Sequence, residues 1–527
     1  MQEKRNYVHG AMLLMVSGLI VKILGALFKI PLTNLIGDNG MGIFAFAMQF
    51  FSILFVITAS GIPIAESCLV SEALAAGQRA QAQRLVWKTG LLFTLVSVVL
   101  AAGLALLAPW IAAHFGEPDT TWSLVAIAPA VVLVTAEAAL RGWYQGTGNM
   151  EPTSVSQVLE ASGKLLFGCA LARLAIQHGL GLAGAAAGGV LGVTMGELIA
   201  VLYLGWSVRH SIGSTLRARK CGQSIPYSRL FSLMIPITLG SAVMTVSGFL
   251  DMTLIYGRMP LTGLSANQIT SVYGAYTGMA LTLYHLPQAF SGAIAVSILP
   301  ALTAAWSRGQ EAACKRLMAS ACRLTTLVCI PCGVILTVFA EPLLRLLFSS
   351  QPQGVAVATP LLECLGFAEV LVGLASVTTS ILQSMERPDI TVCTMTIGSA
   401  AKFAFSYVGM ADPEMGILAA PISSILCFGV ILLLNLAAIY CKMKWVPPLV
   451  RPTLPCIAAS CVMAQGGWQL YQWMLPRYGD TPALLLACAG MPPVYLVVAA
   501  FLRGLNYEDV SMLPGGKQLA AVLKITG

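Results

Sequence analysis

Two lysines in the first apolar run have the spacing best suited to binding chemistry. Lys22 and Lys29 are seven residues apart in a run that begins near residue 10. On a helix this spacing places both on one face, about 10 Å apart along the axis. Gly18 and Gly25 share that face and leave room beside the ammonium groups. Because lysine binds phosphate as a point charge, the pair suits an anionic ligand such as a diphosphate.

The same lysines could instead extend along their helix to the membrane interface. That alternative fits Lys29, near the expected outer end, better than Lys22, in the middle of the run. A charged side chain at the bilayer centre costs about 2.5–3.5 kcal/mol on insertion scales, and it usually faces a cavity or a partner. No acidic residue of the same helix is close enough to pair with them. We therefore expect the lysines to face a cavity.

Other polar residues interrupt the apolar runs and are candidates for substrate binding. Glu137 with Arg141, and Glu160 with Lys164, are spaced i,i+4 and can neutralise each other on one helix face. Structural pairing and substrate binding remain open for both pairs. His285 could titrate near neutral pH or be a hydrogen-bonded structural histidine. The remaining candidates are Glu66, Gln145, Asn149, Asp251 and Lys402, and Glu197, Glu363 and Glu369 are further intramembrane acids.

Three residues should break helices inside the membrane. Gly61 and Pro63 interrupt one apolar run, and Pro287, directly after His285 and Leu286, interrupts another. A proline removes a backbone hydrogen bond and kinks its helix. Broken helices at corresponding positions of two halves point to a binding site and its hinges. We therefore predict hinges at Gly61, Pro63 and Pro287.

Enzyme signatures are absent from the sequence. It contains no Walker A sequence, no GxSxG and no HExxH. The 14 cysteines fall mostly inside apolar runs and are interpreted as small buried side chains rather than metal ligands. We expect no enzyme activity, no cofactor and no metal site. Transport driven by ATP would need another subunit, so a secondary transporter is the simpler interpretation.

Composition identifies the elements that must position these residues. Of the 527 residues, 57% are hydrophobic and 10% are charged, against about 25% charged in a soluble protein. This excludes a soluble enzyme and a disordered chain. A helix that spans a bilayer needs about 20 apolar residues. The sequence therefore predicts an all-α polytopic membrane protein.

Apolar runs predict fourteen spans, and the basic residues orient them. The net charge of +8 does not indicate nucleic acid, because the lysines and arginines lie in short clusters between apolar runs. With an uncleaved first span and both termini in the cytoplasm, 22 of the 30 lysines and arginines lie inside and 4 outside. The predicted spans are 10–35, 42–70, 85–113, 122–145, 155–177, 182–206, 231–255, 272–301, 317–340, 357–383, 390–408, 415–441, 453–475 and 482–502.

An internal repeat divides the chain. Residues 42–85 match residues 274–317 without a gap, at an offset of 232, and both copies contain the loop motif G-Q-x-A-x-x-x-R-L. A second correspondence pairs Gln145, Pro152 and Lys164 with Gln383, Pro388 and Lys402. We predict an N-terminal lobe of six spans at 1–225, a C-terminal lobe of six spans at 226–445, and two extra spans with a cytoplasmic tail at 446–527. Parallel repeats place substrate sites between the halves, near the midplane.

Several motifs together resemble a known family. They are Lys22-Ile-Leu-Gly25, Lys29-Ile-Pro-Leu, Ile36-Gly-Asp-Asn-Gly40-Met-Gly42, Gly61-Ile-Pro-Ile-Ala65, Leu69-Val-Ser-Glu72, Tyr144-Gln-Gly146-x-x-Asn149-Met-x-Pro152-Thr-x-x-Ser156-Gln157-x-x-Glu160, Leu286-Pro287 and Ser297-x-x-Pro300. The set spans residues 10–420 and resembles the stage V sporulation protein B type. That type belongs to the multidrug/oligosaccharidyl-lipid/polysaccharide exporter superfamily, which includes the lipid II flippases.

The resemblance implies two six-helix lobes in a V, a central cavity and alternating access. It also implies an undecaprenyl-diphosphate-linked saccharide as substrate. Basic residues of the first helix line the cavity in related lipid II flippases. Lys22 matches the first such position and Lys29 is offset by one residue from the second. Glu66 departs from the pattern, which usually has an apolar residue there.

The leading hypothesis is a flippase in the cytoplasmic membrane for a polyprenyl-diphosphate-linked saccharide such as lipid II. The expected partners are that substrate, membrane lipids and a coupling ion, with Asp251 as a candidate ion site. We expect a monomer and no nucleic acid. Two rivals remain: a multidrug cation antiporter of the same superfamily, which would need an acidic cavity, and a non-transporting scaffold for cell-wall synthesis.

Overall fold

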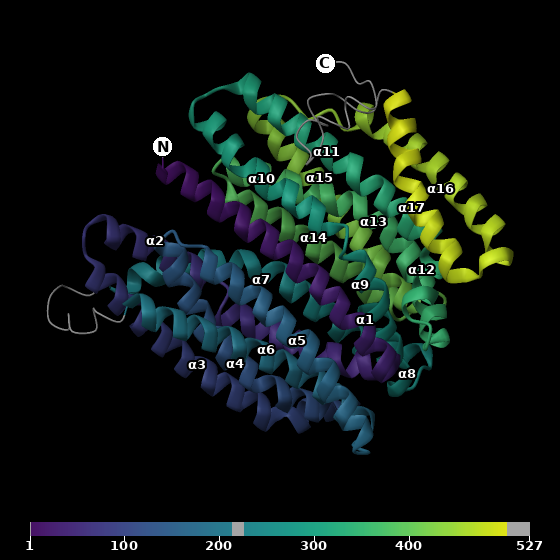
Figure 1. Cartoon of the computed structure of the whole chain (residues 1–527), viewed down its shortest axis with the longest axis horizontal. Helices are drawn as coiled ribbons and strands as arrows, with labels where there is room; N and C mark the ends of the chain where they lie inside the picture. Colours follow the sequence, from purple (N-terminus) through teal and green to yellow (C-terminus); the bar gives the residue numbers. More distant parts are fainter. Residues whose placement is uncertain (1, 213–225, 503–527) are drawn as a thin grey trace. The chain divides into compact units, whose positions relative to one another are not determined.

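The computed structural model describes residues 2–212 and 226–502, and within those ranges every regular element is a helix (Figure 1). The clusters of basic residues at 217–220 and 503–524 lie outside the described residues. In lipid, each backbone polar group must find its partner within the protein, and a helix does this within one segment. The prediction of an all-α polytopic membrane protein is confirmed.

The chain folds into two compact units, Met1–Gly278 and Met279–Gly527. The predicted lobe boundaries near residues 225 and 445 refer to the repeat and stay predictions. The first unit contains α1 (Gln2–Thr58), α2 (Ile62–Ala75), α3 (Arg79–His114), η1 (Pro118–Thr120), α4 (Thr121–Gly146), α5 (Glu151–Gln177), α6 (Gly181–Ile212), α7 (Tyr227–Arg258), η2 (Met259–Thr262) and α8 (Ala266–Gly274). A π-helical segment, η3 (Ala275–Ala280), crosses the boundary.

The second unit continues with α9 (Leu281–Tyr284), α10 (Gln288–Ser307), α11 (Glu311–Val338), α12 (Ala340–Leu347), α13 (Pro352–Ser384), α14 (Pro388–Gly409), η4 (Gly416–Leu418), α15 (Ala419–Met443), α16 (Val450–Tyr478) and α17 (Asp480–Phe501). The last two helices pack against each other, and α16 also packs against α11. An aromatic cluster lies where the end of α11 meets α16, with ring centroids 5.6–6.3 Å apart. It consists of Phe339, Trp468 and Tyr471.

Each predicted span corresponds to helical residues. Ten described helices are long and apolar enough to cross a membrane, and one of them, Val16–Ala75, covers most of the first predicted span and all of the second. The predicted spans at 155–177, 390–408 and 453–475 lie in α5, α14 and α16, which are not among the ten. Long runs of apolar residues therefore located the helices, and the predicted gap between the first two spans falls at the Gly37 kink of α1.

Helices break where glycine and proline predicted it. Helix α1 ends at Thr58 and α2 begins at Ile62, after Gly61 and with Pro63 in its first turn. Helix α9 ends at Tyr284 and α10 begins after Pro287. A further kink within α1 lies at Gly37, between the predicted spans 10–35 and 42–70: Gly37 has a φ of 74°, which suits a residue without a side chain. The breaks are thus present, while their role as hinges stays a prediction.

The internal repeat is visible in a reciprocal contact between α1 and α8. A Cβ placed on Gly42 would lie 2.0 Å from the carbonyl oxygen of Thr270, and one on Gly274 would lie 1.7 Å from that of Asp38. Asp38 and Gly42 each precede their counterparts Thr270 and Gly274 by 232 residues, the offset of the repeat. Ser271 Oγ also donates to Asp38 Oδ2 at 2.7 Å. Equivalent helices of the two copies therefore approach each other through equivalent glycines.

Three helices of each copy share a second pattern. Helix α6 packs against both α4 and α5, as α15 packs against both α13 and α14. Helix α4 ends at Gly146 and α13 ends at Ser384, 238 residues later. Helix α6 begins at Gly181 and α15 begins at Ala419, again 238 residues later. The two three-helix groups are therefore equivalent parts of the repeat at an offset of 238.

Candidate functional site

The two predicted ion pairs of the first unit merge into one buried network. Arg141 Nη2 lies 2.6 Å from Glu137 Oε1 and 2.9 Å from Glu160 Oε2. Lys164 forms ion pairs with Glu160 and with Glu197, the latter at 3.2 Å. These five residues, named here the charge cluster, come from α4 (Glu137, Arg141), α5 (Glu160, Lys164) and α6 (Glu197).

Close packing of α5 against α6 brings these groups together. A Cβ on Gly196 would lie 2.5 Å from the carbonyl oxygen of Glu160 and 2.9 Å from Lys164 Cγ, and one on Gly163 would lie 2.8 Å from Gly196 Cα. Small residues at a helix interface in a membrane let the two backbones approach closely. Because Gly196 precedes Glu197, this approach carries the Glu197 carboxylate to Lys164.

The charge cluster is buried and has more acids than bases. Glu137 is fully buried and the Glu197 side chain is 2% exposed, while Glu160, Arg141 and Lys164 are 15–23% exposed. Carboxylate oxygens of the three glutamates lie within 4.8 Å of one another. With two bases for three carboxyl groups, a fully ionised cluster would have a net charge of −1.

Glu197 was noted as an intramembrane acid in the sequence but was not assigned to the site. The signal that could have found it is the pair Gly192 and Gly196 directly before it. A Cβ on Gly192 would lie 2.1 Å from Gly168 Cα of α5, so this glycine stripe marks the face of α6 that contacts α5. Glu197 follows that face and meets the charged side of α5.

The second unit has a neutral network at equivalent positions. At the offset of 238, Arg141 corresponds to Thr379, Ser156 to Thr394, and Glu197 to Asn435. In the first unit Arg141 Nε donates to Ser156 Oγ at 3.1 Å. In the second, Thr394 Oγ1 donates to Asn435 Oδ1 at 2.8 Å, and Asn435 Nδ2 donates to the hydroxyl oxygens of Thr378 and Thr379 at 3.1 Å. One arrangement of helices therefore accommodates either charged or neutral contents.

The face of α1 that carries the two lysines is open, and whether it faces a cavity stays a prediction. A Cβ on Gly18 or on Gly25 would meet nothing within 4 Å, and Lys22 between them is exposed. Lys29 is half-buried, and its Nζ donates to the carbonyl oxygen of Thr277 at 3.3 Å. The two glycines thus leave space on the helix face that carries the two ammonium groups.

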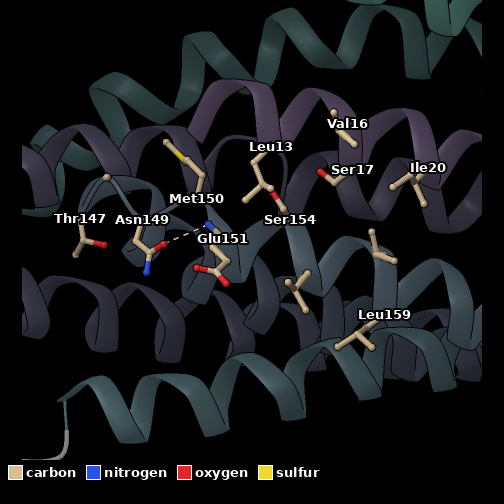
Figure 2. A pocket seen from close by; sticks show the side chains of 13 residues that line it. Leu13, Val16, Ser17, Ile20, Thr147, Asn149, Met150, Glu151, Ser154 and Leu159 are labelled. Carbon is tan, nitrogen blue, oxygen red and sulfur yellow. Dashed lines mark hydrogen bonds between the residues drawn. The ribbon is translucent and has the colours of Figure 1, made fainter. Parts of the chain in front are cut away.

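A pocket of about 740 Å³ lies on the opposite face of α1, against the start of α5 (Figure 2). Its walls are mostly apolar, and its polar end is the loop before α5, where the N–H of Glu151 donates to Asn149 Oδ1 at 3.3 Å. The lining residues are Leu13, Val16, Ser17, Ile20, Thr147, Gly148, Asn149, Met150, Glu151, Ser154, Val155, Val158 and Leu159. With no basic side chain in that lining, the pocket does not suit a diphosphate.

The remaining candidates are not members of the charge cluster. Glu66 is fully buried in α2, where a Cβ on Gly142 of α4 would lie 2.5 Å from Glu66 Oε2. Asp251 in α7 lies near Tyr273, and Gln145 is half-buried near the end of α4. In the second unit, His285 is exposed, with Nδ1 2.9 Å from Gln288 Oε1, and Lys402 is half-buried in α14. Their assignment to substrate binding stays a prediction.

One cysteine pair escaped the sequence analysis. Cys329 and Cys332 have C-x-x-C spacing on α11. Both are free thiols, and Cys329 is fully buried where a Cβ on Gly373 would lie 2.5 Å from its Sγ. Cys329 is thus a small packing residue, as predicted for the cysteines in apolar runs.

The helical architecture and the repeat are those of a multi-pass membrane protein, and comparison with known proteins assigns it to the membrane transporters of the multidrug/oligosaccharidyl-lipid/polysaccharide exporter superfamily. Residues 7–306 match the family described as polysaccharide biosynthesis protein, and residues 236–408 match MatE. Because the first match covers more than half of the chain, the chain belongs to the polysaccharide biosynthesis protein family.

Curated relatives and solved structures agree with this assignment. The chain is 24% identical to stage V sporulation protein B of Bacillus subtilis (strain 168) over 97% of this chain and 98% of that protein. It is 22% identical to the lipid II flippase MurJ of the same organism over 99% and 96%. A structure of lipid II flippase MurJ in an inward closed conformation matches with a TM-score of 0.70 at 15% identity, covering 95% of this chain and 100% of that one.

A multidrug resistance transporter of the MATE family, in an inward-facing conformation, matches with a TM-score of 0.60 at 14% identity, over 82% of this chain and 94% of that one. At these identities the structural likeness establishes the fold alone. The resemblance deduced from the motifs is confirmed, and the substrate is a separate question.

Proposed function

We propose that this chain is a flippase that moves a polyprenyl-diphosphate-linked saccharide across the cytoplasmic membrane by alternating access. The observation that carries the proposal is the open lysine face of α1, where Lys22 and Lys29 lie beside Gly18 and Gly25 in a membrane-spanning helix. A membrane-spanning segment tolerates two cations on such a face when they meet an anionic partner or a polar cavity. The diphosphate is the anionic part of such a substrate.

The orientation follows from the distribution of basic residues and belongs to the same proposal. With both termini in the cytoplasm, the pocket at the start of α5 is on the cytoplasmic side and the α1–α8 glycine contact is on the outer side. The lysine face then lies between the two levels. The saccharide head group would reach Lys22 from the cytoplasm and leave toward the outer surface, while the polyprenyl tail stays in lipid.

Binding of lipid II to the purified full-length protein, measured by native mass spectrometry, tests this function. We expect Lys22→Ala to reduce binding at least tenfold, because one of the two phosphate-binding charges is lost, and Lys22→Arg to retain most of it. Lys88→Ala, at an exposed lysine of α3, is the matched control and should bind like the wild type. Undiminished binding by Lys22→Ala would contradict the proposal.

Export of organic cations is a second candidate, favoured by the match of residues 236–408 to MatE. A cation site on α1 would need carboxylates where Lys22 and Lys29 stand, so we rank it below lipid-carrier transport. The discriminating measurement is resistance of expressing cells to cationic dyes. A flippase predicts no increase in resistance, whereas a cation exporter predicts an increase that survives Lys22→Ala.

A further inference from the structure

We propose that the charge cluster is a proton-binding site that holds one proton between Glu137 and Glu197. The proposal is independent of the substrate, because the cluster lies within α4, α5 and α6. It concerns three acids whose equivalents in the second unit are the uncharged residues Ala375, Gly398 and Asn435. It assigns a ligand to acids that the substrate proposal does not use.

The pattern of ion pairs leaves one carboxyl group without compensation. Glu160 contacts both bases, Arg141 and Lys164, whereas Glu137 contacts Arg141 and Glu197 contacts Lys164. Two positive charges therefore serve three carboxyl groups. An uncompensated ion in the membrane interior is costly, and binding one proton makes the cluster neutral.

Two buried oxygen atoms mark where that proton belongs. Glu137 Oε2 and Glu197 Oε2 are inaccessible, and neither receives a hydrogen bond from the residues that the structure describes. A protonated carboxyl group is a donor, while an ionised one only accepts. Carboxylate oxygens of Glu137 and Glu197 lie within 4.8 Å of each other, so a proton on either residue removes the charge repulsion between them. Two carboxyl groups sharing a site do not both ionise.

A proton fits this site better than a metal ion. Magnesium and calcium take about six to eight oxygen ligands, whereas Arg141 and Lys164 already occupy oxygens of all three carboxyl groups. Ser156 Oγ, the neighbouring hydroxyl oxygen, accepts from Arg141 at 3.1 Å. A proton needs only one oxygen to bind, and Glu137 Oε2 and Glu197 Oε2 both lack a donor among the described residues.

The other charged groups near these helices come from α1, α2 and α3. Helix α1 packs against all three helices of the cluster and carries Lys22 and Lys29, while Glu66 of α2 meets α4 at Gly142. Helix α3 packs against α4 and carries Arg79, Arg84 and Lys88 in its first turns and His114 in its last. Glu66 is a second buried carboxyl group, so an experiment must distinguish its proton from that of the cluster.

Infrared spectroscopy of the purified full-length protein in lipid can count protonated carboxyl groups at neutral pH by their C=O stretch. We expect Glu137→Gln and Glu197→Gln each to lose one proton equivalent from the wild-type band, because two acids then face two bases. Lys164→Met should gain one equivalent, because it leaves three acids with one base. The double variant Glu197→Gln/Lys164→Met should return to the wild-type intensity.

Two controls make the count specific. Glu72→Gln removes an exposed acid that is paired with Arg229 at 2.8 Å and should leave the band unchanged. Glu66→Gln removes only the signal of Glu66 from the band of protonated carboxyl groups. The double variant Glu66→Gln/Glu197→Gln should therefore have one proton equivalent less than Glu66→Gln alone.

Three results would overturn the proposal. They are an unchanged band in both Glu137→Gln and Glu197→Gln, no gain in Lys164→Met, and loss of the wild-type band on adding sodium or magnesium ions. The last result would identify a metal site instead. If a variant fails to insert, the remaining single substitutions decide the question. None of these readouts depends on lipid II binding, so the substrate proposal can fail while this one stands.

Discussion

Equivalent helices of the two repeat copies hold opposite kinds of polar contents. In α4–α6 five ionisable side chains form the charge cluster, whereas in α13–α15 a buried asparagine is surrounded by three threonines. The residues equivalent to Glu137 and Glu160 are Ala375 and Gly398, at the offset of 238. Lys402 is the equivalent of Lys164, so the second copy keeps one base but none of the three acids. The duplicated fold therefore does not require the glutamates at this place, and their presence in one copy calls for another explanation.

The comparison also separates two ways to satisfy buried polar atoms. Both oxygen and nitrogen of the fully buried Asn435 side chain have hydrogen-bond partners, which is the usual state of a buried amide. The charge cluster leaves carboxylate oxygens without donors. A network that is complete by itself suits a structural role, while an incomplete one suits a bound proton.

The largest expected effect comes from removing one base of the charge cluster. Arg141→Met leaves Glu137 and Glu160 without their shared partner, and breaking a buried ion pair in this way costs about 3–5 kcal/mol. The measurement is the free energy of unfolding of the purified protein in detergent. Arg229→Met is the matched control, because its pair with Glu72 is exposed and such pairs contribute about 0–1 kcal/mol. Equal effects of both substitutions would contradict the view that the cluster is a buried network.

A smaller loss is expected from the neutral network. Asn435→Leu removes the partner of Thr394, Thr378 and Thr379, and an unsatisfied buried polar group costs about 1–3 kcal/mol. Two of these hydroxyl groups keep a second partner, since Thr378 donates to Leu374 O and Thr394 to Thr391 O. The same unfolding measurement should therefore rank Asn435→Leu below Arg141→Met. The reverse order would mean that the ionised network contributes less than the neutral one.

The sequence predicted the helices and the duplication because these depend on local composition. Runs of apolar residues located the spans, and Gly61, Pro63 and Pro287 located the breaks. The repeat was detected from loop residues such as Gly77 and Gly309, which adopt positive φ angles in the structure. Each of these signals is contained within a short stretch of chain.

The composition of the charge cluster depends on packing between distant segments and was predicted only in part. The i,i+4 spacing identified the pairs Glu137–Arg141 and Glu160–Lys164. It could not show that Arg141 also reaches Glu160, or that Lys164 reaches Glu197, because those contacts depend on how α4, α5 and α6 meet. The substrate-binding roles proposed for Lys22 and Lys29 require a cavity that local patterns do not define.

Helix spacing offers a third way to sharpen the comparison. Gly196→Ala would place a Cβ 2.5 Å from Glu160 O, so α5 and α6 must separate at the charge cluster. Overpacking of this kind costs about 1–3 kcal/mol. Gly103→Ala on α3, where a Cβ meets nothing within 4 Å, should instead stabilise the protein by about 0.5–1 kcal/mol. Destabilisation by both substitutions, measured by thermal unfolding, would show that the cost is not specific to the α5–α6 contact.

The smallest expected effect is on the pH dependence of the free energy of unfolding, and it comes from an acid outside the spans. Its contribution must be known before a pH dependence is assigned to the charge cluster. Glu117, in the loop between α3 and α4, is buried, and this burial raises the pKa of its carboxyl group above the ordinary 4.5. A hydrogen bond with Thr270 opposes the rise and the charge of Asp119 adds to it. Because the pKa of Glu117 is higher in the folded protein than in the unfolded chain, a proton on Glu117 stabilises the fold. This contribution to the free energy of unfolding is fully present below pH 4.5 and is lost as pH rises through the pKa of the folded protein. We expect Glu117→Gln to flatten the fall in unfolding free energy over that window. A slope that persists in Glu117→Gln would assign the titration to other acids, and the charge cluster would then be the first to test.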